Sequence, residues 1–170
     1  MSSHRMRNMH PAAREYVSRY ATGAMISVIE IGSRNINGTI RDLFPRAQWM
    51  GLDLQDGSGV DHVCDAATYQ PMQRVDLVVC CEVLEHAADW AELIEAAASW
   101  LNPGGRLIVT CAGPGRPQHS AHDGGSLRPG EHYANITAAE LCRAMQSCGI
   151  WIDSAETLGQ DTRASGRLAG

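Results

Sequence analysis

Residues 28–38, a short apolar segment that meets an acid and then a loop, constrain the fold of this chain most strongly. The segment reads Val-Ile-Glu-Ile-Gly-Ser-Arg-Asn-Ile-Asn-Gly, so we predict a buried strand, a turn at Gly32 and a helix after it. Such a turn presents free N–H groups and a helix N-terminus to a ligand, and Glu30 adds a carboxylate. A second strand ends in Asp53, where open α/β sheets hold a ribose. Together these features indicate a nucleoside ligand.

The residues of this loop argue against two common phosphate-binding motifs. A dinucleotide motif GxGxxG starting at Gly32 would need glycines where Arg34 and Asn37 stand. A P-loop would end in Gly-Lys-Ser or Gly-Lys-Thr, but Gly38 is followed by Thr39 and the chain contains no lysine. The lack of lysine also excludes Schiff-base chemistry with pyridoxal phosphate.

Composition narrows the class of protein further. With 170 residues, the chain fits a single domain over 1–170, with an N-terminal helical segment at 1–24 and a core at 25–168. A net charge of −5 argues against a general nucleic-acid binder. The six cysteines form no CxxC pair, as expected of buried thiols in a reducing compartment. Because no segment is apolar enough for a membrane span or a signal peptide, we expect a cytoplasmic protein.

Strand and helix patterns alternate along the chain, which predicts a mostly parallel sheet with helices on both faces. A first helix begins at Pro11, with Tyr16 and Val17 on its apolar side. Five strands are expected at 26–31, 48–53, 61–64, 75–80 and 106–111, and two further helices at 37–44 and 89–101.

The last part of the chain predicts a loop, a capped helix and a hairpin. The loop runs from Ala112 to Asn135, and Thr137 with Glu140 forms a capping box in front of the helix. Strands at 150–158 and 161–168 are joined by a two-residue turn, so we expect them to be antiparallel. The predicted fold is therefore an α/β, Rossmann-like seven-stranded sheet, mostly parallel, with a C-terminal antiparallel hairpin.

This arrangement resembles the class I S-adenosylmethionine-dependent methyltransferases over about residues 25–168. The resemblance rests on five segments in chain order: Glu30-Ile31-Gly32, Asp53, Asp65, Val83-Leu84-Glu85-His86 and Asn102-Pro103-Gly104-Gly105-Arg106-Leu107. The family's common pattern also has glycines at positions 34 and 36, where this chain has Arg34 and Ile36. Its loop is consequently longer, and resembles a variant found in small methyltransferases of phages and bacteria.

The resemblance implies S-adenosylmethionine as the cofactor and a role for each segment. Glu30 and Gly32 would receive its amino-acid end, Asp53 the ribose hydroxyls, and Asp65 with the Ala66 backbone the adenine edge. The other cofactor residues that it implies are Ser33, Asn35, Gly38, Leu54, Cys81 and Glu82.

Methyl transfer needs alignment of donor and acceptor and, for a hydroxyl or protonated amine, a base. The loop after the fifth strand commonly faces the acceptor in the family, so we expect His119 or His122 to be that base. We interpret His86 as a packing or cofactor-pocket residue. His119-x-x-His122-Asp123 has metal-ligand composition, but we expect no metal, because such spacings on glycine-rich loops also arise without one. Glu131-His132-Tyr133 could anchor the loop to the last helix.

These observations predict a methyltransferase acting on a small-molecule acceptor, with nucleotide, sugar and natural-product acceptors left open. No membrane partner is expected, and a homodimer is one way to complete the acceptor site. Two alternatives remain at this point: a protein of the same fold that binds S-adenosylmethionine or a nucleotide without transfer, and an NAD-dependent Rossmann oxidoreductase.

Overall fold

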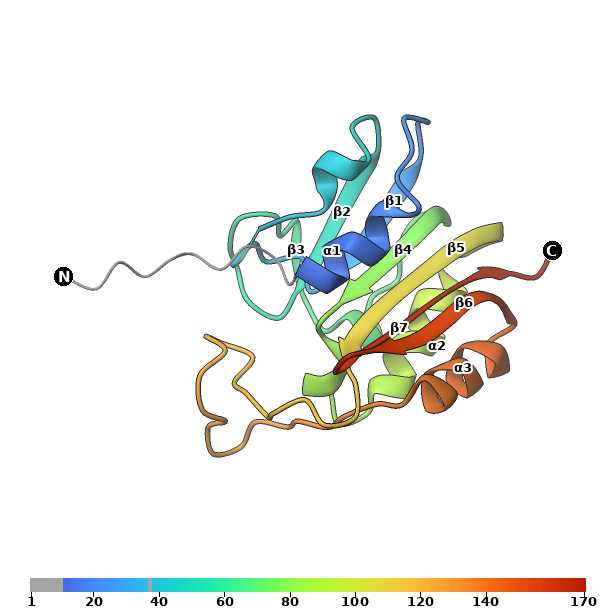
Figure 1. Cartoon of the computed structure of the whole chain (residues 1–170). Coiled ribbons are helices and arrows are strands. Elements are labelled where there is room, and N and C mark those ends of the chain that lie inside the picture. Colours follow the sequence, from blue (N-terminus) through green and yellow to red (C-terminus); the bar gives the residue numbers. More distant parts are fainter. Residues whose placement is uncertain (1–10, 37) are drawn as a thin grey trace.

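A single twisted sheet forms the centre of the protein (Figure 1). The computed structural model describes residues 11–36 and 38–170, which form seven strands in the order β3-β2-β1-β4-β5-β7-β6. Neighbours from β3 to β5 pair in parallel, whereas β7 pairs antiparallel with both β5 and β6. The strands are β1 (Ser27–Ile31), β2 (Gln48–Asp53), β3 (His62–Val63), β4 (Val75–Cys81), β5 (Leu101–Ala112), β6 (Ile150–Leu158) and β7 (Asp161–Leu168). The predicted sheet and its C-terminal hairpin are confirmed.

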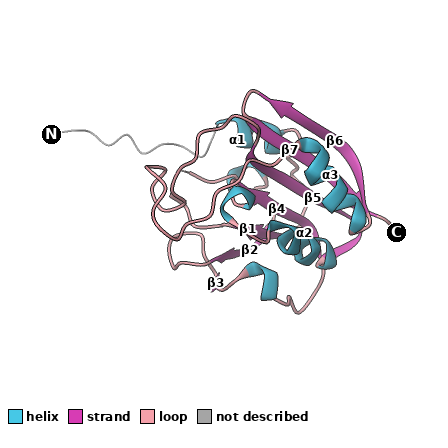
Figure 2. Ribbon diagram, turned by 90° about the horizontal axis from the view of Figure 1, so that it is seen from below, coloured by secondary structure: helices cyan, strands magenta, loops and turns pink. Residues whose placement is uncertain are grey.

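Helices cover both faces of this sheet (Figures 1 and 2). α2 (Trp90–Ser99) and α3 (Ala138–Ser147) bury their apolar residues against one face, where Ile29 and Val78 point. α1 (Pro11–Ser18) buries Tyr16 against the opposite face, beside Val28 and Leu77. Successive residues of β1 and β4 thus enter opposite cores, as the two-residue period of a strand requires. No helix in the described part of the chain is long and apolar enough to cross a membrane.

The order of the strands fixes where a ligand can bind. The chain leaves β1 toward β2 and β3 on one side, and then returns to place β4 on the other side of β1. Open α/β sheets bind ligands at the carboxyl ends of the strands where the order reverses in this way. Gly32 follows β1 and Glu82 follows β4, so both lie at this edge.

Three predicted elements differ from the structure, and the simplest case is the helix expected at 89–101, which ends at Ser99 because Leu101 already belongs to β5. The helix expected at 37–44, whose first residue lies outside the described residues, is a single 3₁₀ turn at Arg41–Leu43. Ile40 and Phe44 on either side of it are buried in the core, and Pro45 prevents continuation. β5 starts at Leu101 instead of 106, because an irregular stretch of the strand precedes its regular pairing with β4.

Local sequence signals elsewhere are confirmed. Thr137 Oγ1 accepts a hydrogen bond from the Glu140 amide at 3.2 Å, and the Glu140 carboxylate accepts one from the Thr137 amide at 2.9 Å. This capping box satisfies two N–H groups that the first turn of α3 would otherwise leave without partners. α3 then buries Leu141 and Met145.

A buried arginine joins α1 to the C-terminal hairpin. Arg163 on β7 is fully buried, and its Nη1 donates to the Glu15 carboxylate at 2.7 Å and to the Ala12 carbonyl at 3.1 Å. Its Nη2 lies 3.2 Å from the carboxylate of Glu156 on β6, and the guanidinium stacks 5.1 Å from the centre of the Tyr16 ring. The two carboxylates offset part of the cost of burying this arginine, whose Nε and Nη2 have no hydrogen-bond partner among the described residues.

Candidate functional site

The loop after β1 folds back onto the end of β2. The amides of Gly32 and Ser33 both donate to the Leu52 carbonyl, at 2.9 and 3.1 Å, and the Arg34 amide donates to the Asp53 carboxylate at 3.0 Å. The other described amides of this loop also have acceptors within the protein. The expectation of free N–H groups and a helix N-terminus is therefore wrong, because internal contacts use these groups and no α-helix follows.

Asn35 and Gly38 shape this loop. The Asn35 amide donates to the Ser58 carbonyl at 2.8 Å, and its side-chain oxygen accepts from the Gly38 amide at 2.9 Å. Gly38 has a φ of 115° and Gly32 a φ of 74°, both in the left-handed region that favours glycine. The buried hydroxyl of Ser33 has no hydrogen-bond partner among the described residues, so it is a polar group that a ligand could satisfy.

Glu30 is already paired within the protein. Its carboxylate accepts a hydrogen bond from Arg41 Nε at 2.9 Å, and the Arg41 guanidinium also donates to the Gly59 carbonyl at 2.6 Å. Burial raises the pKa of Glu30 above its ordinary value, and Arg41 opposes that shift. The acid expected to receive the amino-acid end of the cofactor thus also fixes the segment after the loop.

Asp53 ends β2 with both oxygens turned toward backbone amides. One accepts from Arg34, and the other accepts from the Gln55 amide at 3.0 Å. A carboxylate oxygen has two lone pairs, so each can accept a further hydrogen bond from a hydroxyl. The next residue, Leu54, is 72% exposed. Gln55 Nε2 lies 3.0 Å from His122 Nδ1, so the loop after β5 reaches the end of β2.

Asp65 caps a short 3₁₀ helix after β3. Its side chain accepts from the Ala67 amide at 3.0 Å, and Ala66 is buried beneath it. The predicted pair follows β3, whose neighbour Cys64 donates its amide to the Asp53 carbonyl at 2.9 Å, so it lies near the carboxyl end of β2.

Glu82, directly after β4, adopts a strained backbone conformation. Its φ of 59° lies in a region that residues other than glycine rarely occupy, and such strain often marks functional sites. Its carboxylate accepts from Thr110 Oγ1 at 2.9 Å and from Arg116 Nη1 at 2.5 Å, and Arg116 also pairs with Asp161 at 3.1 Å. The neighbouring Cys81 thiol has its pKa raised by burial, so it is not an activated nucleophile.

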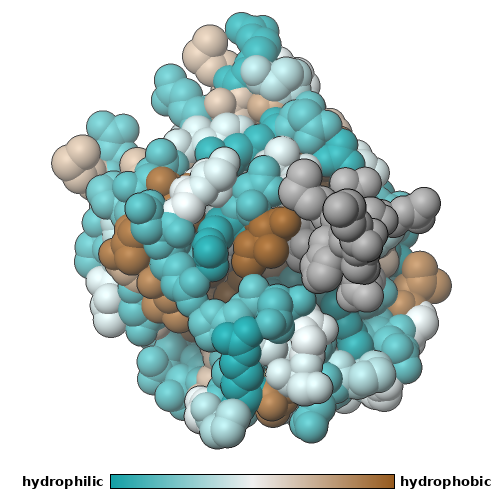
Figure 3. All heavy atoms as spheres, turned by 90° about the vertical axis from the view of Figure 1, so that its left-hand side faces the viewer, coloured by the Kyte–Doolittle hydropathy of each residue, from teal (hydrophilic) through white to brown (hydrophobic). Residues whose placement is uncertain are grey.

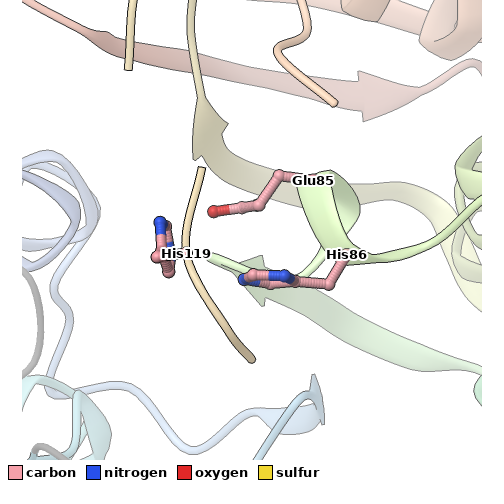
Figure 4. A group of neighbouring side chains, drawn as sticks. All are labelled: Glu85, His86 and His119. Atoms are coloured by element: carbon pink, nitrogen blue, oxygen red, sulfur yellow. The ribbon is translucent and has the colours of Figure 1, made fainter. Parts of the chain in front are cut away.

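A compact cluster of polar side chains lies beside the end of β4 (Figure 4). Glu85 and His86 come from the 3₁₀ turn after β4, and His119 comes from the loop after β5. The ring centres of His86 and His119 are 5.0 Å apart, and Tyr133 packs against both rings at 5.4 and 4.9 Å. Glu85 is completely buried, yet neither carboxylate oxygen has a hydrogen-bond partner among the described residues.

Burial dominates the electrostatics of this cluster. It raises the pKa of Glu85 to about 8, with a further contribution from the Glu82 carboxylate. It also lowers the pKa of His86 to about 4, which keeps that imidazole neutral near pH 7. Neutral imidazoles can accept a proton or bind a metal ion.

His122, the second predicted base, lies apart from His119. It contacts Gln55, and its Nε2 lies 3.7 Å from the Glu131 carboxylate. Asp123 is paired with Arg128 at 2.5 Å. The metal ligand set considered at 119, 122 and 123 is therefore not assembled among the described residues, whose one group with metal-binding geometry is Glu85, His86 and His119.

Hydrogen bonds within the loop after β5 hold its conformation. Glu131 accepts from Ser120 Oγ at 2.8 Å and from the Arg128 amide at 2.7 Å. Tyr133 packs on the rings of His86 and His119. The anchoring of this segment to α3 stays a prediction. Viewed from the side where this loop lies, the surface is mostly hydrophilic with apolar atoms gathered near its middle (Figure 3).

Sequence reasoning missed the roles of Glu85 and Arg116. Glu85 belongs to one of the five segments that carry the resemblance to methyltransferases. The amino-acid sequence, however, does not show whether a carboxylate in a 3₁₀ turn is buried or exposed. Arg116 meets Glu82 across 34 positions of sequence, and only the path of the loop brings them together.

Comparison with known proteins identifies the family. The family model described as methyltransferase domain matches residues 5–154. The chain belongs to this family. Among curated relatives of this methyltransferase-domain protein, the ubiquinone biosynthesis O-methyltransferase of Aeromonas salmonicida is 26% identical over 138 residues, covering 76% of this chain and 55% of the relative. That of Xanthomonas euvesicatoria is 32% identical over 121 residues, covering 60% and 49%.

A solved structure supports the fold. The 1,6-didemethyltoxoflavin-N1-methyltransferase of Burkholderia thailandensis, crystallised with 1,6-didemethyltoxoflavin and S-adenosylhomocysteine, superposes with a TM-score of 0.72 at 14% identity. The match covers 94% of this chain and 79% of that one. The expected Rossmann-like methyltransferase fold is thereby confirmed. The chain spans about half the length of the curated relatives that it matches.

Proposed function

We propose that this protein is an S-adenosylmethionine-dependent methyltransferase acting on a small-molecule acceptor. The observation that carries the proposal is the position of Asp53. It ends β2, next to the glycine turn of β1, in a sheet whose order and family are those of methyltransferases. Its two oxygens are oriented by backbone amides and keep lone pairs for two ribose hydroxyls.

The remaining cofactor assignments follow the same edge of the sheet. Ser33 and Gly32 border the space proposed for the amino-acid end, with Glu30 behind them. Asp65 and Ala66 lie where the adenine edge would bind. The cofactor's sulfonium supplies an electrophilic methyl group, and this chain's own residues have only to align the acceptor and remove its proton.

A hydroxyl is the acceptor group that we favour. The two curated relatives named above are O-methyltransferases, and a hydroxyl must lose a proton as it is methylated. His119 lies beside the neutral His86 at the end of β4, and we propose that it removes this proton, with His122 as the alternative base. Phenolic, nucleotide and sugar hydroxyls all fit this chemistry.

Calorimetry tests the cofactor assignment. Wild-type protein should bind S-adenosylhomocysteine, and Asp53→Ala should bind it roughly 10–100-fold more weakly because a charged acceptor is lost. Asp56→Ala is the matched control, since Asp56 lies in the same loop and is expected to leave the affinity unchanged. Melting curves of all three proteins separate lost binding from lost folding. Binding of NAD without S-adenosylhomocysteine would instead favour an oxidoreductase.

Isotope transfer tests the reaction. The protein is incubated with methyl-labelled S-adenosylmethionine and with separate metabolite, protein and nucleic-acid fractions of a cell extract. Label should appear in the metabolite fraction. Label in protein or nucleic acid would refute the small-molecule assignment, and cofactor binding with no labelled product in any fraction would favour a binding protein without transfer activity.

Cellular location and assembly belong to the same proposal. All six cysteines are free thiols, which supports a cytoplasmic enzyme in a reducing compartment. A homodimer that completes the acceptor site is expected to appear as twice the monomer mass in light scattering.

A further inference from the structure

The Glu85 side chain is a buried carboxylate that a ligand could stabilise. Both oxygens of Glu85 are fully buried and have no hydrogen-bond partner among the described residues. A buried polar group in this state costs roughly 1–3 kcal/mol, and more when it is charged. His86 Nδ1 beside it is also buried without a partner. Two adjacent residues therefore leave three buried polar atoms without a hydrogen-bond partner among the described residues, and a bound ligand could satisfy them.

The geometry of the cluster fits a cation. One ligand atom each from Glu85, His86 and His119 lies within 4.8 Å of the other two, and the three side chains converge in Figure 4. Ligands bound at about 2.0–2.2 Å lie roughly 3–3.5 Å apart around a tetrahedral or octahedral ion. The donors would have to approach by at most about 1.3–1.8 Å, and His119 lies on the loop after β5.

A positive charge that acts on the cluster, that of Arg116, is paired within the protein. Arg116 is paired with Glu82 at 2.5 Å and with Asp161 at 3.1 Å, so its guanidinium already has two carboxylates. Tyr133 closes one side of the cluster through ring contacts with both histidines. The positive charge of Arg116 still lowers the pKa of His86, whereas the Glu131 carboxylate raises it, so charges of both signs act on the cluster.

We propose that Glu85, His86 and His119 bind a divalent first-row transition ion, such as Zn²⁺, Mn²⁺ or Co²⁺. Two imidazoles and one carboxylate are a donor set that suits these ions better than Mg²⁺ or Ca²⁺, which prefer oxygen ligands. Three protein ligands leave coordination positions for water or for an oxygen of the acceptor. The role of this ion rests on the proposed function: it would orient an acceptor hydroxyl and lower the pKa of that hydroxyl. His119 would then be a metal ligand and not the base.

Cobalt binding tests the site without cofactor or acceptor. Co²⁺ is titrated into the full chain and followed by its visible d–d absorption and by calorimetry. We expect about one ion per chain, with no sulfur-to-cobalt charge-transfer band, because no cysteine belongs to the cluster. His119→Ala and Glu85→Gln should each weaken binding by roughly 100-fold or more, beyond the effect of losing an outer-shell partner. His122→Ala, in the same loop but outside the cluster, should bind as the wild type does.

The outcomes separate this inference from the proposed function. No saturable binding, equal affinity in the wild type and His119→Ala, or a thiolate charge-transfer band would overturn the metal site. S-adenosylhomocysteine binding is measured on the same proteins, and its failure would refute the cofactor assignment while leaving the metal result intact. Melting curves show whether Glu85→Gln is folded, and His119→Ala, on a loop, provides the second variant.

Discussion

Replacing Gly32 with alanine should destabilise this protein even without any ligand. The residue has a φ of 74°, and a Cβ built on it would lie 2.3 Å from Cγ2 of Val83. Carbon atoms pack at about 3.5–4.0 Å, so one of the two side chains must move. The sequence alone suggests only that a side chain at this position would occupy space needed by the cofactor.

The magnitude has two parts. Placing an L-residue in the left-handed region costs about 1–2 kcal/mol. Overpacking against Val83, which contributes to the core below α2, costs about 1–3 kcal/mol more. We therefore expect Gly32→Ala to lower the free energy of unfolding by roughly 2–5 kcal/mol, or the melting temperature by at least about 4 °C.

A double-mutant cycle isolates the contact. Val83→Ala removes the opposing methyl groups, so the pair Gly32→Ala with Val83→Ala should recover about 1–3 kcal/mol relative to the sum of the single effects. Urea unfolding followed by circular dichroism measures all four proteins. Strictly additive losses would show that the two positions do not touch, and an unchanged stability of Gly32→Ala would refute the left-handed geometry as well.

Three further predictions concern stability. Thr137→Ala should lower the free energy of unfolding by about 1 kcal/mol in urea, because the capping box of α3 is lost; no change would mean that water replaces the cap. Arg163→Ala should cost roughly 2–4 kcal/mol, with Arg163→Met recovering part of it by refilling the space; equal losses in both would assign the effect to charge alone. The Ser27 amide holds the pKa of Asp76 below its ordinary value, so Asp76 stabilises the fold above the unfolded-state pKa and loses that contribution as pH falls through the folded pKa. The melting difference between wild type and Asp76→Ala should therefore be present at pH 7 and shrink below about pH 4, whereas a difference that grows with acid would contradict this sign.

The parts of the fold that local physics determines could be predicted from the sequence. The capping box at Thr137 and the tight turn between β6 and β7 are both specified within a few residues. The strand ends at Asp53 and Gly32 follow from short apolar runs stopped by polar or turn residues. These signals need no knowledge of distant contacts, and they were sufficient to place the carboxyl edge of the sheet.

What could not be predicted depends on distant partners. The segment after Gly38 has residues compatible with a helix. Only one 3₁₀ turn forms there, and Arg41 in this turn donates hydrogen bonds to Glu30 and to the Gly59 carbonyl. The separation of His119 from His122 is set by the path of a long loop, since one contacts His86 and the other contacts Gln55. The spacing of apolar residues along the sequence predicts neither of these two arrangements.

The ion pair between the buried Arg163 and the exposed Glu15 has a consequence for the order of folding. The two residues are 148 positions apart in the chain, so α1 cannot reach its final partner until nearly the whole sequence has been synthesised. Until then the Tyr16 side of the helix lacks the guanidinium that covers it. Contacts between residues so far apart in sequence form slowly. During synthesis α1 therefore leaves the ribosome long before Arg163 does, and its packing is completed only when the hairpin of β6 and β7 has followed.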